Sequence, residues 1–536
     1  MKGRSWGAGI AAALALGWAW IPAAGAVPFS ASTPVEASGS SPFVGCSTPA
    51  GSGVVFTNSE VEPWVDANPA NPDNLVGFYQ QDRWSNGGAK SNLATVSMNG
   101  GASWTQVVVP VGTICSSSGD FERASDPWVT FSPNGVVHAM SLVTDSDPPA
   151  GFGDNGMSYN RSTNGGLTWE APIFLIEDTN PRVLNDKNSI TADPNDSRFV
   201  YAVWDRLQTA AADTHLRSAE NRPGRGFKGP IYFARTTDGG VSWEPARRIY
   251  ETGANKQTLG NQIVVEPAAS GGSLFDFFAD ITNASERRKI FGPVGVSYIR
   301  SDNRGVTWTK PIKVADQLPM SLFRASSTID PESPPAPCPV PDSQGNCPIR
   351  SGDLLPEVAV NRTNGNLYAV WMDARFDAFQ NDAIAFTQST NGGASWSAPI
   401  KVNLTPETEP VGDQQAFTPS VHVADDGTVA VSYYDFRNNT QDPGMLLTDE
   451  FAVHCDAAAE ICTSRASWNE ETRITPTSFD IREAPFARGY FVGDYVGLTA
   501  TDESSGPDGP KNDFMSLFGS THGSGPSSVF SSRLSK

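Results

Sequence analysis

An eight-residue phrase recurs five times between residues 97 and 396, and it constrains the fold more than any other feature. The copies share the pattern Ser/Thr-x-Asp/Asn-x-Gly-x-Ser/Thr-Trp. They are SMNGGASW at Ser97, STNGGLTW at Ser162, TTDGGVSW at Thr236, SDNRGVTW at Ser301 and STNGGASW at Ser389. An Asp or Asn side chain can bond to nearby backbone N–H groups, Gly permits a positive φ, and Trp is a large apolar plug. We predict that each copy, called a clamp below, folds a β-hairpin turn and locks it onto a neighbouring unit.

A second repeat alternates with the clamps and divides nearly the whole chain into units of four short strands. Its apolar first strands align at Val65, Val129, Ile190, Val264, Val358, Val421 and Val496. In each unit a second strand follows, a third leads into the clamp, and a fourth comes after the clamp tryptophan. Repeated four-stranded units without long helices predict an all-β propeller with four-stranded antiparallel blades. We prefer seven blades, with residues 53–59 completing the last blade, and six blades is the alternative if the last unit is only an extension.

The N-terminus has the pattern of a secretory signal. Lys2 and Arg4 precede an apolar run from Trp6 to Ile21, and small residues follow at 24–26. We therefore predict a signal peptide over 1–26, a flexible Ser/Pro-rich lead-in over 27–45, and a single propeller domain over 46–536 in a secreted protein.

The six cysteines fit an extracellular location, where disulfides persist. Cys338 lies close to Cys347 and Cys455 close to Cys462, which leaves Cys46 and Cys115, although six cysteines allow fifteen pairings. No CxxC or HExxH spacing occurs and no EF-hand-like loop is evident. We expect no cofactor and no metal, with calcium on the acidic face as the alternative.

The net charge of −20 argues against nucleic acid or an anionic membrane as a partner, since both would repel the chain. We expect a monomer.

The five clamps resemble the Asp-box, or BNR repeat, of the sialidase (neuraminidase) superfamily. This resemblance implies that the clamps have a structural role, at the end of the propeller opposite the active site. It also implies a glycan substrate, arginines that hold the substrate's carboxylate, a tyrosine nucleophile and an aspartate acid/base. Asp-boxes also occur in non-catalytic receptors and polysaccharide lyases.

The starts of first strands and the ends of second strands are expected to meet at the functional face. The candidate residues there are Arg83, Asp126, Arg206, Arg375, Tyr434, Arg437, Asp494 and Tyr495, and further first-strand positions are Glu62, Lys187 and Asp413. Because an Asp/Arg signature ends four of the second strands, a structural Asp–Arg brace is the alternative to a catalytic set.

The sequence is consistent with three functions. The first hypothesis is a glycoside hydrolase, of exo-α-sialidase type, acting at the central funnel. The alternative is a non-catalytic propeller that binds an extracellular protein or glycan, or a polysaccharide lyase. Arg83 is the only arginine between the signal and the first clamp, and it is followed by Trp84 and Ser85 rather than by the Ile-Pro typical of sialidases.

Overall fold

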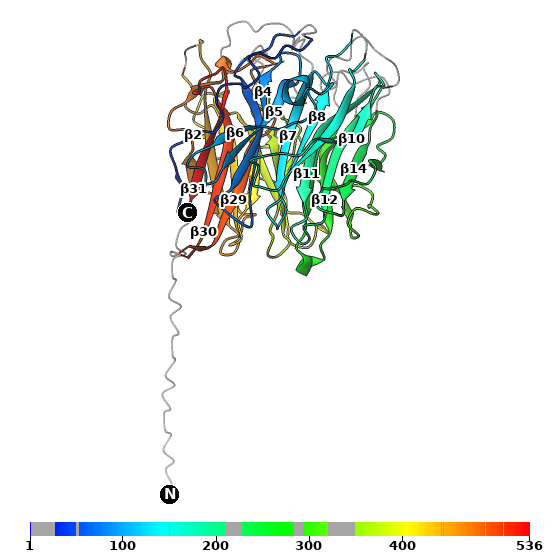
Figure 1. The fold of residues 1–536 in the computed structure, drawn as a ribbon. Helices are drawn as coiled ribbons and strands as arrows, with labels where there is room; N and C mark the ends of the chain where they lie inside the picture. Colours follow the sequence, from blue (N-terminus) through cyan, green and yellow to red (C-terminus); the bar gives the residue numbers. More distant parts are fainter. Residues whose placement is uncertain are drawn as a thin grey trace.

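The computed structural model describes residues 27–49, 53–148, 151–209, 228–282, 293–319, 349–440, 444–487, 489–506 and 509–536, together with residues 1 and 442. The Cys338–Cys347 pairing and residues 2–26 of the predicted signal peptide lie outside this part of the chain. The described residues form an all-β fold, as predicted, with strands standing upright around the molecule (Figure 1).

Successive strands pair antiparallel in seven sets, numbered here in chain order. Short pairings of β5 with β7 and of β13 with β16 join sets one and two and sets three and four, so the described strands form five hydrogen-bonded sheets. Sets one and two are β3 (Glu60–Ala67), β4 (Leu75–Arg83), β5 (Ala89–Ser97) and β6 (Thr105–Val108), then β7 (Arg123–Phe131), β8 (Val137–Thr144), β9 (Asn155–Ser162) and β10 (Ile173–Asp178). Sets three and four are β11 (Val183–Ala192), β12 (Val200–Gln208), β14 (Ile231–Thr236) and β15 (Arg247–Tyr250), then β16 (Lys256–Val265), β17 (Leu274–Thr282), β18 (Val294–Ser301) and β19 (Ile312–Gln317).

The remaining sets follow the same order. Set five is β20 (Glu357–Val360), β21 (Leu367–Asp373), β22 (Ala383–Ser389) and β23 (Ile400–Lys401), and set six is β24 (Ala416–Val423), β25 (Thr428–Asp435), β26 (Leu447–Asp456) and β27 (Glu471–Arg473). Set seven is β29 (Gly497–Gly506), β30 (Gly509–Ser520) and β31 (Ser528–Ser535), completed by β1 (Ser30–Ala31) and β2 (Val35–Glu36). The short strands β13 (Lys228–Gly229) and β28 (Phe479–Asp480), helix α1 (Ile114–Ser117) and four 3₁₀ turns (Ala268–Ser270, Ala374–Phe376, Arg465–Ser467 and Ile481–Glu483) are accessory.

The first strands of the seven sets surround a common axis. Each packs against the first strand of the next set, and β29 returns to β3, so the two ends of the chain meet. A cavity of about 530 Å³ is lined by residues from all seven first strands. Figure 1 shows set seven, in orange to red, beside set one in blue.

The five clamps form the predicted turns and lock sets one to five each onto the preceding set of the ring. In the second clamp, Asn164 Oδ1 accepts the N–H of Thr168 at 3.0 Å, and Ser162 Oγ accepts the N–H of Gly166 at 3.0 Å. Gly166 has φ +93°, and a Cβ there would meet Val76 of set one at 2.7 Å, so only glycine fits. Trp104 of the first clamp donates to Ser531 of set seven at 2.8 Å, which ties the two ends of the chain together.

The prediction of a flexible lead-in over 27–45 is wrong. Strands β1 and β2 pair with β31 and complete set seven, in place of residues 53–59, which form only two isolated bridges, Val55–Trp84 and Ser59–Ser527. Phe29 is 4% exposed and packs against His454 and Phe514. The Ser/Pro-rich composition hid these short strands, because their pairing partner lies some 500 residues away in sequence.

The alignment of the fourth unit is also corrected by one residue. Gln262 is the first residue after the register shift in β16, as Trp64 is in β3, so Ile263 rather than Val264 is equivalent to Val65. The run Ile263–Val265 is continuously apolar, so the sequence pattern does not define which residue faces the axis.

Two disulfides are present among the described residues: Cys455–Cys462, which sequence proximity favoured, and Cys46–Cys115, the two cysteines that the local pairs left over. Among the described residues, no helix is long and apolar enough to cross a membrane.

Candidate functional site

The first strands carry β-bulges at the end of the axis opposite the clamps, and these bulges bring charged side chains together. In β3, β7 and β11 the pairing register shifts across Glu62, Asp126 and Lys187. All three have positive φ, at 53°, 46° and 45°, which is strained for a residue with a Cβ. Glycine stands at the corresponding position of β16, Gly260, so the backbone needs no side chain there.

These side chains form a buried ionic cluster, called the hub below, of Glu62, Asp126, Lys187, Arg350 and Asp494. Lys187 Nζ lies 2.7 Å from Asp494, 3.1 Å from Asp126 and 3.5 Å from Glu62. Arg350 binds the same Asp494 through two nitrogens, at 2.7 and 3.2 Å. The hub therefore joins sets one, two, three and seven with the segment that precedes set five.

Burial and nearby charges shift the pKa values of Glu62 and Asp494 in opposite directions. Burial, with the nearby Asp126 and Asp494, raises the pKa of Glu62 to about 8 despite Lys187. Burial alone would raise the pKa of Asp494, but Arg350 and Lys187 outweigh it and hold that pKa well below its ordinary value. Burial alone would lower the pKa of Lys187, and the three carboxylates instead raise it well above its ordinary value. At neutral pH the hub thus contains a protonated glutamic acid beside an ionised aspartate.

Arg83 lies next to the hub and reaches it through Gln80. Arg83 Nη1 donates to Gln80 Oε1 at 2.5 Å, and Gln80 Nε2 donates in turn to Glu62. The guanidinium groups of Arg83 and Arg350 both lie over the ring of Phe491, at 4.9 and 4.3 Å. Phe491 therefore packs against both guanidinium groups beside the hub.

Three of the arginines predicted to hold substrate are occupied by carboxylates, which belong to the same set for Arg375 and Arg437 and to the preceding set for Arg206. Arg206 pairs with Asp178 at 2.5 Å, and Arg375 makes a two-pronged pair with Asp373. Arg437 binds Asp435 at 2.6 Å and also Glu471. These three arginines therefore match the structural Asp–Arg brace, the alternative to a catalytic set.

The two predicted tyrosines are buried, and their hydroxyl groups are hydrogen-bonded to the backbone. Tyr434 Oη donates to the carbonyl of Gly519 at 2.9 Å and accepts its N–H at 3.0 Å. Tyr495 Oη donates to the carbonyl of Pro127 at 3.1 Å, and its ring lies against Trp128. Burial raises the pKa of both phenols well above the ordinary value, which disfavours a phenolate nucleophile.

The structure therefore brings together Asp126 and Asp494 of the predicted candidates, with Arg83 and Tyr495 adjacent. The sequence pattern placed Glu62 and Lys187 at the starts of first strands but did not predict that they lie together. Arg350 was not predicted as a site residue, because it follows the Pro/Cys-rich insertion. Asp413 lies elsewhere, bonded to Asn439 at 3.0 Å. Within the described residues, no group of three or more His, Cys, Asp or Glu side chains is arranged to hold a metal ion; the cation among the hub carboxylates is Lys187.

No protein-family model and no curated protein match the chain. Among solved structures, it is similar to a Hadza microbial sialidase, at 14% identity over 86% of this chain and 74% of that one, with a TM-score of 0.43. It is also similar to an α-L-arabinofuranosidase of Fusarium graminearum, at 12% identity over 77% and 93%, with a TM-score of 0.41. A leech intramolecular trans-sialidase matches at 10% identity over 92% and 95%, with a TM-score of 0.40. At these levels of overlap, the activity has to be argued from the chain's own residues.

Proposed function

We propose that the protein is a seven-bladed propeller that acts on glycans and cleaves a glycosidic bond at the hub, with Glu62 as the proton donor. The seven blades are the seven strand sets, and the closed cycle of first-strand contacts supports that number. The functional proposal rests on one observation: Glu62, Asp126 and Lys187 occupy strained left-handed positions at neighbouring bulges. Such strain in non-glycine residues concentrates at functional sites.

The protonation states of the hub suit this chemistry. Glycosidases pair a carboxylic acid that protonates the departing oxygen with a carboxylate that stabilises or attacks the cationic sugar. Glu62, with its raised pKa, is the acid, and Asp494 is the carboxylate. Lys187 contacts both and acts as a positioning residue. Arg350 has a side chain that is 13% exposed, the most exposed of the hub, so the substrate would approach past it.

The test is hydrolysis of fluorogenic glycosides, including an α-sialoside and an α-L-arabinofuranoside, by the chain that starts at Val27. We expect turnover of at least one glycoside, and Glu62→Gln should lower kcat at least about 100-fold because a general acid is lost. Lys313→Met, in an exposed ion pair with Asp316, is the matched control and should keep full activity. Undiminished turnover in a folded Glu62→Gln variant would contradict the proposal.

A second candidate function is non-catalytic recognition of a glycan or protein. It is favoured by the pairing of Arg206, Arg375 and Arg437 with carboxylates, which leaves none of these three to hold a substrate carboxylate. Absence of turnover on every glycoside, with saturable binding of the same compounds, would select this candidate.

We further propose that the protein is exported as a single-domain monomer. The disulfides Cys46–Cys115 and Cys455–Cys462 support an oxidising compartment. N-terminal sequencing of the secreted chain tests cleavage near Val27.

A further inference from the structure

The axial cavity opens at the clamp end of the molecule, away from the hub. It is lined by the second halves of the first strands, and Ala67 at the end of β3 pairs with Leu75, which pairs in turn with Ser97 of the first clamp. Trp64 and Trp128 stack with ring centroids 3.6 Å apart and line the end of the cavity nearest the hub. The volume of about 530 Å³ is that of a small-molecule site.

The rim of this cavity is rigid. Four of the first strands run into a proline that lines the cavity, namely Pro69, Pro133, Pro194 and Pro267. A proline ring fixes φ, so these rim segments lose little conformational freedom when a ligand binds.

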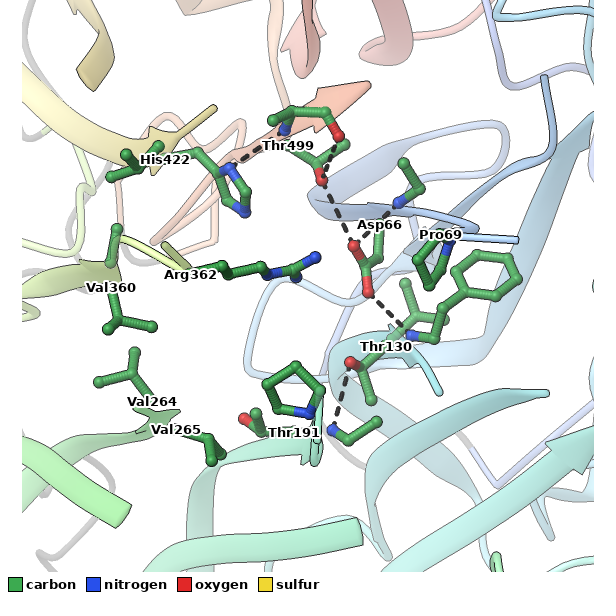
Figure 2. A pocket seen from close by; sticks show the side chains of 18 of the residues that line it. Asp66, Pro69, Thr130, Thr191, Val264, Val265, Val360, Arg362, His422 and Thr499 are labelled. Carbon is green, nitrogen blue, oxygen red and sulfur yellow. Dashed lines mark hydrogen bonds between the residues drawn. The ribbon is translucent and has the colours of Figure 1, made fainter. Parts of the chain in front are cut away.

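Arg362 projects into the cavity and is the feature that points to a ligand. Figure 2 shows its guanidinium between His422 and Asp66. Within the described residues, Arg362 forms no hydrogen bond and no ion pair, although its charge helps to lower the pKa of Asp66 against the larger effect of burial. The two groups thus face each other across a space that a ligand could bridge.

Asp66 is held in place by hydrogen bonds, one of which a ligand hydroxyl could replace. Its Oδ2 accepts the N–H of Phe131 at 2.8 Å, and its Oδ1 accepts the N–H of Ala67 at 2.8 Å and the hydroxyl of Thr499 at 3.3 Å. A carboxylate has about four acceptor positions, and the Thr130 hydroxyl faces the fourth, so a ligand hydroxyl would replace Thr130 there.

His422 supplies a neutral donor on the other side of Arg362. Its Nδ1 accepts the N–H of Ala500 at 3.1 Å, so the proton of the neutral ring resides on Nε2. Burial and the charge of Arg362 lower the pKa of His422 to about 3, which keeps the ring neutral at physiological pH.

From this geometry we infer that the axial cavity is a binding site for a sugar acid of the uronate type. The carboxylate of the ligand pairs with Arg362, a hydroxyl donates to Asp66, and the sugar ring lies towards Trp64 and Trp128. A single carboxylate suits one arginine, whereas a phosphate dianion is disfavoured by Asp66 and by the net charge of −20. The inference is independent of hydrolysis at the hub, because the two sites occupy opposite ends of the axis and the readout is binding.

Calorimetric titration of the chain starting at Val27 with D-glucuronate, D-glucose and acetate tests this inference. We expect glucuronate to bind at least about tenfold more tightly than glucose, because only glucuronate brings a carboxylate to pair with Arg362. In Arg362→Gln this preference should disappear while the melting temperature stays unchanged, since Arg362 is exposed. Arg198→Gln, an exposed arginine paired with Asp196, is the matched control and should retain the preference.

The inference would be overturned by absence of saturable glucuronate binding at millimolar concentration, by equal affinity for glucose and glucuronate, or by an unchanged preference in Arg362→Gln. Acetate that binds as tightly as glucuronate would identify a simple anion site instead and would equally overturn it.

Discussion

Lys187 of set three and Asp494, which leads into set seven, form a buried ion pair at 2.7 Å across 307 residues of sequence. Their side chains are only 6% and 4% exposed. Asp126 and Glu62 share the same ammonium group, so one lysine balances carboxyl groups contributed by three other sets. Lys187 is therefore both the centre of the candidate site and a tie that holds the ring together.

Lys187→Met should destabilise the protein by about 3–5 kcal/mol, because it leaves buried carboxylates without their cation. Chemical denaturation at pH 7 measures the loss. The deficit should shrink as the pH is lowered, since protonation removes the uncompensated charges. Lys313→Met, in a pair whose side chains are 57% exposed, should change stability by less than about 0.5 kcal/mol. Equal effects of the two substitutions would show that the hub is not a stabilising tie.

The stability of the protein should fall as the pH rises from 6.5 to 8. Burial raises the pKa to about 8 for four carboxyl groups, those of Glu60, Glu62, Glu357 and Glu450. Between about pH 4.5 and pH 8 the folded chain therefore binds more protons than the unfolded chain. The free energy of unfolding consequently decreases as the pH rises. Three histidines, His138, His422 and His454, have lowered pKa values and act in the opposite direction, but only below about 6.5.

Glu357→Gln isolates one of these groups. Glu357 accepts a hydrogen bond from Gln262 at 3.1 Å, and a neutral amide of the same shape removes its titration. The slope of unfolding free energy against pH between 6.5 and 8 should decrease by up to one proton, or about 1.4 kcal/mol per pH unit. Glu170→Gln, at a side chain that is 53% exposed, should leave the slope unchanged. A slope unaffected by Glu357→Gln would mean that this carboxyl group is ionised in the folded protein.

Ser162→Ala should destabilise the second clamp by about 1–3 kcal/mol, because the buried N–H of Gly166 loses its acceptor. Thr168→Ala removes only an exposed hydrogen bond to Asn164 and should cost less than about 0.5 kcal/mol. Thermal unfolding of both variants distinguishes a buried clamp from a surface turn. If Thr168→Ala proved as damaging as Ser162→Ala, the clamp would be stabilised from its exposed side.

Phe29→Ala should cost about 3–5 kcal/mol, because the ring fills a buried site against His454, at a ring separation of 4.2 Å. Val27→Ala, at a position that is 65% exposed, should have no measurable effect. Comparison of the two melting temperatures tests whether the N-terminal segment is part of set seven. Identical temperatures would restore the interpretation of residues 27–45 as a lead-in.

Removing the two disulfides should have unequal effects. Replacing Cys46 and Cys115 by Ser frees a loop that spans 69 residues and should cost about 4 kcal/mol, whereas Cys455–Cys462 spans only 7 and should cost about 2 kcal/mol. The order of the two melting temperatures provides the measurement. The reverse order would indicate that loop length does not control their contribution.

The amino-acid sequence by itself determined the local units of this protein. Clamp residues such as Asn164 and Gly166 act through hydrogen bonds and φ values within five residues, so their pattern predicts the turn directly. The apolar first strands, and with them the all-β class, follow from residue patterns that are equally short in range. The tertiary structure decided everything that depends on pairing between distant segments. It placed residues 30–36 beside β31, paired three of the four predicted substrate arginines with carboxylates, and joined Lys187, Arg350 and Asp494 in one cluster. The physical reason is that a ring brings residues hundreds of positions apart to one axis, and local propensity carries no information about which distant charges meet there.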